Sequence, residues 1–231
     1  MTETDPLRAA MIEAAERQLA SSADHEVATR AVCEAVGVSQ PVLYRLFGDK
    51  RGLLDAVADH GYERYTALKA AQERTCDPVA DLHAGWDGHL AFARANPALY
   101  QLMFTPRPWS RSTARERVMD LLTAALTRCA AVGALKTEPP TAARLILSAN
   151  IGTALDHIAR PALFDDPATS HRMRDAVFSH VLTATPAERG ADPLRTAALR
   201  LRAQLQLGAA DALEPVETAL LQRWLERIAD A

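Results

Sequence analysis

The feature that most constrains this chain is the spacing of its apolar residues. In segment after segment they recur with the period of an amphipathic α-helix. Asx-Pro pairs and single glycines separate these segments, at the kinds of position where helices begin and end. Alanine and leucine, which are good helix formers, dominate the apolar set, and long β-branched or aromatic runs are missing. We therefore predict an all-α fold.

Helix caps place the predicted helices along the chain. Gly37 and Gly48 end two short helices near the N-terminus, and Asp49 begins a long one. Asp77-Pro78 and Asn96-Pro97 begin two more. The predicted helices span about residues 6–20, 29–36, 40–47, 50–74, 78–95, 97–104, 112–131, 141–160, 168–184, 193–207 and 215–229.

Composition and charge exclude several classes of protein. The chain has 231 residues, of which 48% are hydrophobic, so it can form a large core. Its net charge of −3 means that any nucleic-acid binding has to depend on a local basic patch. No segment approaches the roughly 18 apolar residues of a membrane span, and the charged N-terminus is unlike a signal peptide. We expect no membrane association.

Three cysteines, Cys33, Cys76 and Cys129, are widely spaced and form no CxxC pair. This pattern argues against a disulfide framework and against a zinc ribbon. Reduced thiols in a cytoplasmic protein are the expectation.

The segment from Thr29 to Arg51, TRAVCEAVGVSQPVLYRLFGDKR, has the most informative pattern. It predicts two short helices joined at Gly37, a residue that adopts positive φ without a steric cost. Cys33 is expected in the core rather than as a reactive thiol. Four apolar residues are spaced to bury the angle between the helices: Val32, Val36, Val38 and Leu43. In this geometry a second helix can enter the major groove of DNA while the first crosses the backbone.

The second helix has side chains suited to a DNA groove. Gln40 can pair bidentately with an adenine edge, and Pro41 offers apolar contact to a thymine methyl. Ser39 suits either the helix N-cap or a phosphate. Tyr44 suits a phosphate, and Arg45 can reach a phosphate or a guanine.

Further phosphate-binding candidates flank this helix. Thr29 and Arg30 stand at the N-terminus of the first helix, where free N–H groups favour an anion. Lys50 and Arg51 begin the next helix, within reach of the flanking backbone. From residue 29 to 51 there are four basic and two acidic residues, a local balance of +2. Two short helices can also meet at a glycine without binding DNA, but the ordered run of phosphate and base donors favours DNA binding.

The string GVSQPVLYRLFGDKRGLLDAV resembles the DNA-binding signature of the tetracycline-repressor (TetR) family. The resemblance covers about residues 8–60. It depends on Gly37-Val38-Ser39, Leu43-Tyr44, Phe47, Lys50 and Leu53-Leu54. Two features depart from the family pattern: Glu16 stands where an apolar residue is usual, and the Ser21–Glu26 loop lacks a common glycine.

The resemblance implies an all-α homodimer with two domains. A three-helix N-terminal domain, residues 1–50, would hold the helix-turn-helix, and residues 51–231 would form a larger helical ligand-binding and dimerisation domain. The family pattern places Gln40, Pro41 and Val42 against bases. It places Thr29, Tyr44 and Lys50 on phosphates.

A small-molecule pocket is expected in the second domain. The segment FARANPALYQLMF, residues 92–104, resembles one found in the ligand domains of many family members. Most bulky residues around it are expected to be core, and some would line a mainly apolar cavity with a few polar groups. The candidates are Trp86, His89, Phe92, Tyr100, Met103, Phe104, Trp109, Asn150 and His157. The proline-bounded loop 105–109 could gate such a cavity.

Catalytic and metal-binding motifs are missing from the sequence. There is no HExxH, P-loop, GxGxxG or GxSxG, so neither an enzyme nor a cofactor is expected. His83 and Asp87 share a helical face near Asp81, where a metal site is conceivable and a solvated pair is expected. A helical enzyme or scaffold with an incidental helix-turn-helix is the alternative class.

The leading hypothesis is a repressor that binds double-stranded operator DNA and is released by a small-molecule effector. An activator or dual regulator of the same fold would have the same sequence features. A homodimer is expected because it reads two half-sites. The predicted interface helices are 141–160 and 168–184, with Ile146, Asn150 and Ala154 as a stripe for close packing; the last two helices would cap the domain or extend the interface.

Overall fold

The computed structural model of the chain describes residues 4–22, 26–110, 113–164, 166–183, 193–208 and 213–229. Within these ranges the chain is helical, and its β pairing is limited to one bridge between Leu135 and Leu182. The predicted all-α class is confirmed. None of the helices in these ranges is long and apolar enough to cross a membrane.

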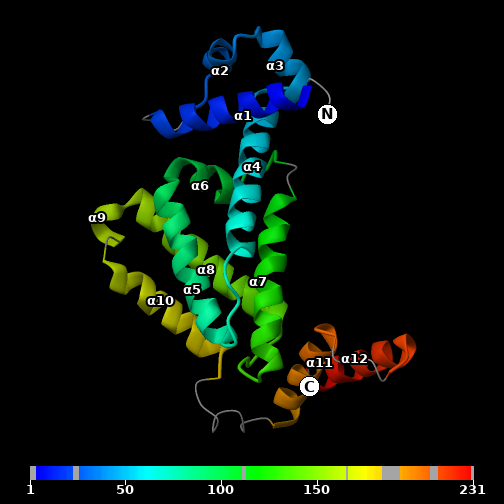
Figure 1. The fold of residues 1–231 in the computed structure, drawn as a ribbon. Coiled ribbons are helices and arrows are strands. Elements are labelled where there is room, and N and C mark those ends of the chain that lie inside the picture. Colours follow the sequence, from blue (N-terminus) through cyan, green and yellow to red (C-terminus); the bar gives the residue numbers. More distant parts are fainter. Residues whose placement is uncertain are drawn as a thin grey trace. The chain divides into compact units, whose positions relative to one another are not determined.

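Figure 1 shows the helices in chain order. They are α1 (Thr4–Ser21), α2 (Thr29–Val36), α3 (Gln40–Phe47), α4 (Lys50–Ala70), α5 (Pro78–Ala95), α6 (Pro97–Phe104), α7 (Ala114–Ala131), α8 (Pro139–Ala159), α9 (Pro161–Phe164), α10 (Pro167–Val181), α11 (Pro193–Gln206) and α12 (Pro215–Ala229). All the predicted helices are present, and α2, α3, α5, α6 and α12 have the predicted bounds. The short α9 was not predicted, because four residues are too few to show a helical period.

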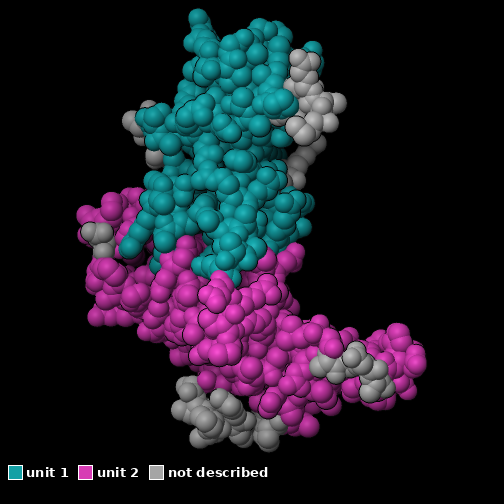
Figure 2. Space-filling view, viewed as in Figure 1, with its two compact units in different colours: residues 1–72, 90–118 teal, residues 73–89, 119–231 magenta. Residues whose placement is uncertain are grey.

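The chain forms two compact units, which Figure 2 distinguishes by colour. The first unit comprises residues 1–72 and 90–118, and the second comprises residues 73–89 and 119–231. The helix-turn-helix lies in the first unit, together with α1, α4 and α6.

The first unit is built around α1 and α4. In it α1 packs against α2, α4 and α6, and α4 packs against α3 and α6. Met11, Leu43 and Leu53 are fully buried at the centre of these contacts. Burying one such side chain contributes roughly 1.5–3 kcal/mol, so this core holds the helix-turn-helix against α1 and α4.

An aromatic cluster joins α4 to the end of α5 and to α6. The rings of Tyr62 and Phe104 meet edge to face with centroids 5.4 Å apart, and Tyr65 and Phe92 do so at 5.1 Å. Each such pair is worth about 0.5–1.5 kcal/mol beyond its buried area. Gly61 permits the close approach, because a Cβ there would lie 2.8 Å from the sulfur of Met103.

In the second unit, α8 packs against α10, and α11 packs against α12. The buried face of α8 includes Ile146, Asn150 and Ala154, which are 3%, 4% and 1% exposed within the chain itself. The prediction that these three residues form a dimer-contacting stripe is therefore wrong. Their helical spacing marks the side of α8 that packs inward.

Gly52 of α4 is required by a close approach of two backbones. A Cβ at this position would lie 1.9 Å from the carbonyl oxygen of Phe47, at the end of α3. We expect Gly52→Ala to lower the free energy of unfolding by about 1–3 kcal/mol, because a backbone atom cannot move aside as a flexible side chain does. Urea denaturation would measure this.

Gly85→Ala is the matched control for Gly52→Ala. A Cβ at Gly85 in α5 meets nothing within 4 Å, so only helix propensity acts there. That variant should gain up to about 1 kcal/mol. A Gly52→Ala protein as stable as the wild type would contradict the predicted clash.

Candidate DNA-binding site

The turn between α2 and α3 is made by Gly37. Its φ of 75° lies in the left-handed region, which glycine adopts without the strain that a Cβ brings. Its N–H donates to the carbonyls of Cys33 and Glu34, and the N–H of Val38 donates to the Cys33 carbonyl at 3.0 Å. These bonds satisfy the carbonyl groups left open at the end of α2. The predicted glycine turn is confirmed.

The angle between α2 and α3 is filled by apolar side chains. Val32 and Leu43 are buried as predicted, whereas Val36 and Val38 are only half-buried. Cys33 is 3% exposed, which confirms its expected place in the core. Burial, with a smaller effect from the Glu34 charge, raises the pKa of its thiol. Cys33 is therefore a packing residue of the motif.

The N-terminus of α3 presents polar groups on the surface. Ser39 has the extended backbone of an N-cap residue but makes no side-chain cap hydrogen bond. This arrangement favours the phosphate alternative for its hydroxyl. The side-chain amide of Gln40 donates to the hydroxyl of Thr29 at 3.4 Å. The structure thus brings together one residue predicted to contact a base and one predicted to contact a phosphate.

Further along α3, Pro41, Tyr44 and Arg45 are exposed, and Val42 is half-buried. Pro41 lies in the first turn, where proline fits a helix without losing a hydrogen bond. Tyr44 is 44% exposed, a high fraction for a large aromatic side chain in a packed motif. These side chains are accessible to a partner that covers the outer face of α3.

Asp49 sets the start of α4. Its carboxylate accepts a hydrogen bond from the N–H of Gly52 at 2.8 Å, which caps the helix. Such a cap contributes about 1 kcal/mol. Lys50 and Arg51 follow at once and are exposed, so the cap fixes two cations directly after α3, the candidate recognition helix.

Arg30 lies on the surface of α2. Its guanidinium pairs with Glu34 at 2.8 Å, and the two side chains are 83% and 64% exposed. The hydrogen bond with Glu34 raises the pKa of Arg30, which stays charged. Because exposed pairs of this kind are weak, a DNA phosphate can compete for the guanidinium.

Glu16 of α1 departs from the family pattern for a structural reason. Its carboxylate pairs with Arg64 of α4, and Arg64 also donates to the side chain of Asn96 at 3.2 Å. A polar bridge from α1 to α4 thus takes the place of an apolar contact. Part of the other departure, the loop after α1, lies outside the described residues at 23–25.

The residues predicted to line an effector pocket fall into two groups. Phe92, Tyr100, Met103, Phe104 and Trp109 belong to the first unit, and Trp86, His89, Asn150 and His157 belong to the second. The first group, apart from Trp109, is buried around Tyr62 and Tyr65. Trp109 instead lies beside the guanidinium groups of Arg51 and Arg107.

In the second unit, Trp86 and Asn150 come together. The indole N–H of Trp86 donates to the Ser170 hydroxyl at 3.0 Å, and the amide of Asn150 donates to the Trp86 carbonyl at 3.4 Å. The amide oxygen of Asn150 is buried with no hydrogen-bond partner in the structure. His157 is half-buried and bonds to the carbonyl of Phe164 at 2.8 Å. As ligand contacts, these residues stay predictions.

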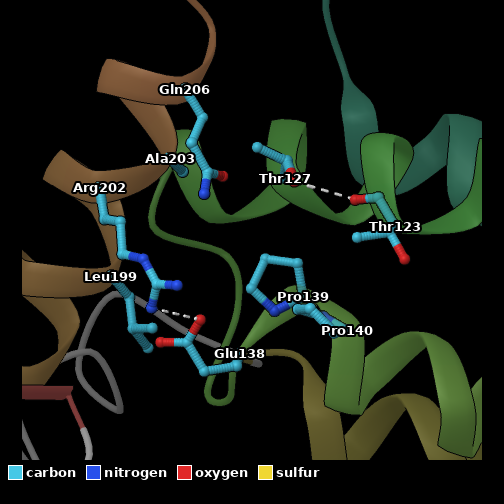
Figure 3. A pocket seen from close by; sticks show the side chains of 9 residues that line it. All are labelled: Thr123, Thr127, Glu138, Pro139, Pro140, Leu199, Arg202, Ala203 and Gln206. Carbon is cyan, nitrogen blue, oxygen red and sulfur yellow. Dashed lines mark hydrogen bonds and ion pairs between the residues drawn. The ribbon is translucent and has the colours of Figure 1, made fainter. Parts of the chain in front are cut away.

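A small cavity lies elsewhere in the second unit (Figure 3). Its volume is about 70 Å³, and the ion pair between Glu138 and Arg202, at 2.9 Å, forms part of its wall. The other lining residues are Thr123, Thr127, Pro139, Pro140, Leu199, Ala203 and Gln206. Drug-sized ligands occupy pockets of roughly 300–1,000 Å³. This cavity is too small for them, and none of the predicted pocket residues lines it.

The acidic residues near His83 are engaged separately. Asp87 pairs with Arg174 at 3.5 Å, and Asp81 pairs with Arg128 at 2.8 Å. The His83 ring packs edge to face on Phe178, and burial lowers its pKa. Among the described residues, no three His, Cys, Asp or Glu side chains gather as a metal would require.

Two helices meeting at a glycine turn, with polar and basic side chains on the outer helix, define the helix-turn-helix class of DNA-binding proteins. Comparison with known families gives the particular family. A model described as "Bacterial regulatory proteins, tetR family" matches residues 11–57, and one described as "Tetracyclin repressor-like, C-terminal domain" matches residues 82–206. The chain belongs to the TetR family of bacterial DNA-binding transcriptional regulators. No curated protein matches it by sequence.

Solved structures show the same fold. SmeT, named as the repressor of the Stenotrophomonas maltophilia multidrug efflux pump SmeDEF, is 17% identical with a TM-score of 0.60, over 79% of this chain and 94% of SmeT. NalD, a secondary repressor of an efflux pump in Pseudomonas aeruginosa, is 17% identical with a TM-score of 0.55, over 79% and 99%. A Rhodococcus sp. RHA1 protein is 24% identical with a TM-score of 0.63, over 77% and 96%.

The burial of the thiols gives a test of how firmly the motif is packed. Cys33 and Cys129 are buried and Cys76 is exposed; burial raises the pKa of Cys129 to about 12. In native protein at pH 8, we expect one thiol per chain to react rapidly with a chromogenic disulfide, because Cys76 is exposed, whereas burial blocks access to Cys33 and Cys129 and raises the pKa of both thiols. Cys76→Ser should abolish that phase, and urea should expose the others. A rapid phase in native protein that Cys33→Ser reduces would contradict the packed motif.

Proposed function

We propose that this chain is a repressor that binds operator DNA as a homodimer and is released by a small-molecule effector. The observation that supports it most is the set of exposed donors at the start of α2, along α3 and at the start of α4. SmeT and NalD are named repressors, which supports repression over activation. In this proposal residues 1–50 bind DNA, residues 51–231 bind the effector and the second copy, and the protein acts in the cytoplasm.

The contacts divide into those that read bases and those that position the protein. Gln40, Pro41 and Val42 lie at the start of α3 and would face base edges in the major groove. The remaining candidates would bind phosphates and fix the orientation of the motif. These are Thr29, Arg30, Ser39, Tyr44, Lys50 and Arg45, and for Arg45 a guanine is the alternative target.

Charge sets how such an interface behaves. The local balance of +2 over residues 29–51 lies within a chain of net charge −3. A dimer presents this patch twice, to half-sites about 34–36 Å apart or a multiple of that spacing. Binding should therefore weaken steeply with salt.

Gln40 and Tyr44 should differ in the kind of loss that their removal causes. We expect Tyr44→Ala to weaken binding to all duplexes, because it removes a phosphate contact, and Gln40→Ala to relax preference at one base pair at a cost of about 1–3 kcal/mol. Gel-shift titration on the promoter region beside the chain's own gene, and on random duplex, would measure both.

The proposed function sets clear outcomes for this titration. Leu68→Glu, at a site in α4 that is 60% exposed, is a control that should bind like the wild type. Equal losses on both duplexes for Gln40→Ala and Tyr44→Ala would contradict the assigned roles. Wild-type protein without salt-sensitive binding would contradict a DNA-binding regulator.

The effector site is proposed around Trp86 and Asn150. The amide oxygen of Asn150 is buried without a hydrogen-bond partner. Losing its hydration without a replacement bond destabilises the fold by about 1–3 kcal/mol. An effector with an N–H or O–H group would supply the missing bond. Release from DNA then requires the effector to bind a conformation with wrongly spaced recognition helices more tightly than the DNA-bound one.

The dimer interface is proposed on the outer faces of α8 and α10. Leu145 on α8 and Met173 on α10 are 40% and 45% exposed. Gly152, on the same face of α8 as Leu145, is exposed, and a Cβ there meets nothing within 4 Å of the same chain. A small residue is thus compatible with close packing by a second copy.

A large charged residue at position 152 tests this interface. We expect Gly152→Glu to yield monomers in size-exclusion chromatography with light scattering, because the side chain would be buried unpaired in the dimer, while the isolated chain has room for it. Helix content by circular dichroism should be unchanged. Leu68→Glu is the control on α4. If Gly152→Glu stays dimeric, the proposed interface is wrong, and α11 and α12 are the next candidates.

A further inference from the structure

An aromatic side chain from outside the helix-turn-helix holds one of its cations. Trp109 lies in the segment after α6, and the guanidinium of Arg51, at the start of α4, sits 5.8 Å from its ring centroid. The guanidinium of Arg107 lies 5.0 Å from the same ring. Both distances are within the range of cation–π attraction. All three residues belong to the first unit.

A second set of contacts anchors the same segment one turn further along α4. Asp55 pairs with Arg107 at 3.2 Å and accepts a hydrogen bond from the Ser110 hydroxyl at 2.8 Å. The side chains of Arg107 and Asp55 are only 12% and 19% exposed. Water screens such a pair less than it screens a surface pair. The segment 107–110 is therefore fastened to α4 at Asp55, and Trp109 is presented to Arg51 from a fixed position.

Within the described part of the chain, Arg107 is neutralised by a carboxylate, and Arg51 is not. Arg107 has the carboxylate of Asp55, whereas Arg51 makes no ion pair with a carboxylate of the described residues. Arg51 is exposed and follows Lys50, directly after the cap at Asp49. Its charge is held in place by the ring without being cancelled, which is the condition that favours a phosphate partner.

We propose that Trp109 is a positioning residue for DNA binding, which holds the Arg51 guanidinium for a phosphate flanking the recognition helix. A free arginine side chain loses rotamer freedom when it binds, and the stacked one has lost part of that freedom beforehand. The inference depends on the proposed function, since it needs DNA at the helix-turn-helix. If Trp109 has this role, DNA affinity depends on a residue far along the chain from the helix-turn-helix.

A double-mutant cycle tests the coupling between Arg51 and Trp109. The variants are Arg51→Ala, Trp109→Leu, the double variant and Trp109→Phe, and fluorescence anisotropy with the promoter duplex and a random duplex gives the affinities. We expect Arg51→Ala and Trp109→Leu each to weaken binding about 3- to 10-fold on both duplexes, and the double variant to lose little more than either single variant. Trp109→Phe should restore most of the affinity, because it keeps a ring face.

The salt dependence separates a missing charge from a misplaced one. Arg51→Ala should reduce the slope of log K against log salt by about 1 for each phosphate that the variant no longer neutralises, whereas Trp109→Leu should change it less because the charge remains. Leu68→Glu in α4 is again the control, since Leu68 is 60% exposed and lies outside every proposed contact; it should bind like the wild type. Thermal unfolding of each variant checks that the fold persists.

Three outcomes would overturn the inference. They are additive losses in the double variant, wild-type affinity for Trp109→Leu, or no recovery with Trp109→Phe in a folded protein. If Tyr44→Ala and Lys50→Ala weaken binding while Trp109→Leu does not, the proposed function stands and the role of Trp109 fails. A wild-type protein that ignores DNA would overturn both.

Discussion

The geometry of the DNA-binding surface depends on the corner between α3 and α4. Gly48 ends α3 with a positive φ, Asp49 caps α4, and Gly52 lets the Phe47 carbonyl approach to a distance that a Cβ would block. These three residues fix the direction of α3 relative to the long helix α4. Every proposed phosphate contact after Tyr44, and the place of Arg51 beside Trp109, follows from that direction.

Local signals explain why most of the fold could be predicted from sequence. Gly37, Gly48 and Asp49 act within a few residues of themselves, so their effect on helix ends can be inferred from neighbouring positions. The inner stripe of α8 shows where such inference ends. Helical spacing indicated that Ile146, Asn150 and Ala154 share a face, but the partner of that face is set by long-range packing. The same limit applies to Glu16, whose partner Arg64 lies on another helix.

The two halves of the proposed function differ in how well sequence can locate them. Most of the residues proposed to contact DNA are exposed, polar and close together in the chain, and they stand out against the apolar period of their helices. Residues that line an apolar pocket have the same sequence pattern as core residues. For Tyr100 and Phe104, that pattern cannot distinguish a pocket role from a core role. In the proposed effector site, the feature that a fully satisfied core residue would lack is the amide oxygen of Asn150, which is buried without a hydrogen-bond partner.

Charge placement connects these observations. In a chain of net charge −3, the cations near the recognition helix have to be kept from neighbouring carboxylates if they are to meet phosphates. Arg30 meets this condition only in part, through an exposed pair with Glu34 that DNA can displace. Arg51 meets it by a different route, since Asp55, the carboxylate one turn away, is occupied by Arg107 and Ser110. The segment after α6 therefore does two things for the surface: it occupies a carboxylate that would otherwise compete for Arg51, and it supplies an aromatic face that holds the cation without neutralising it.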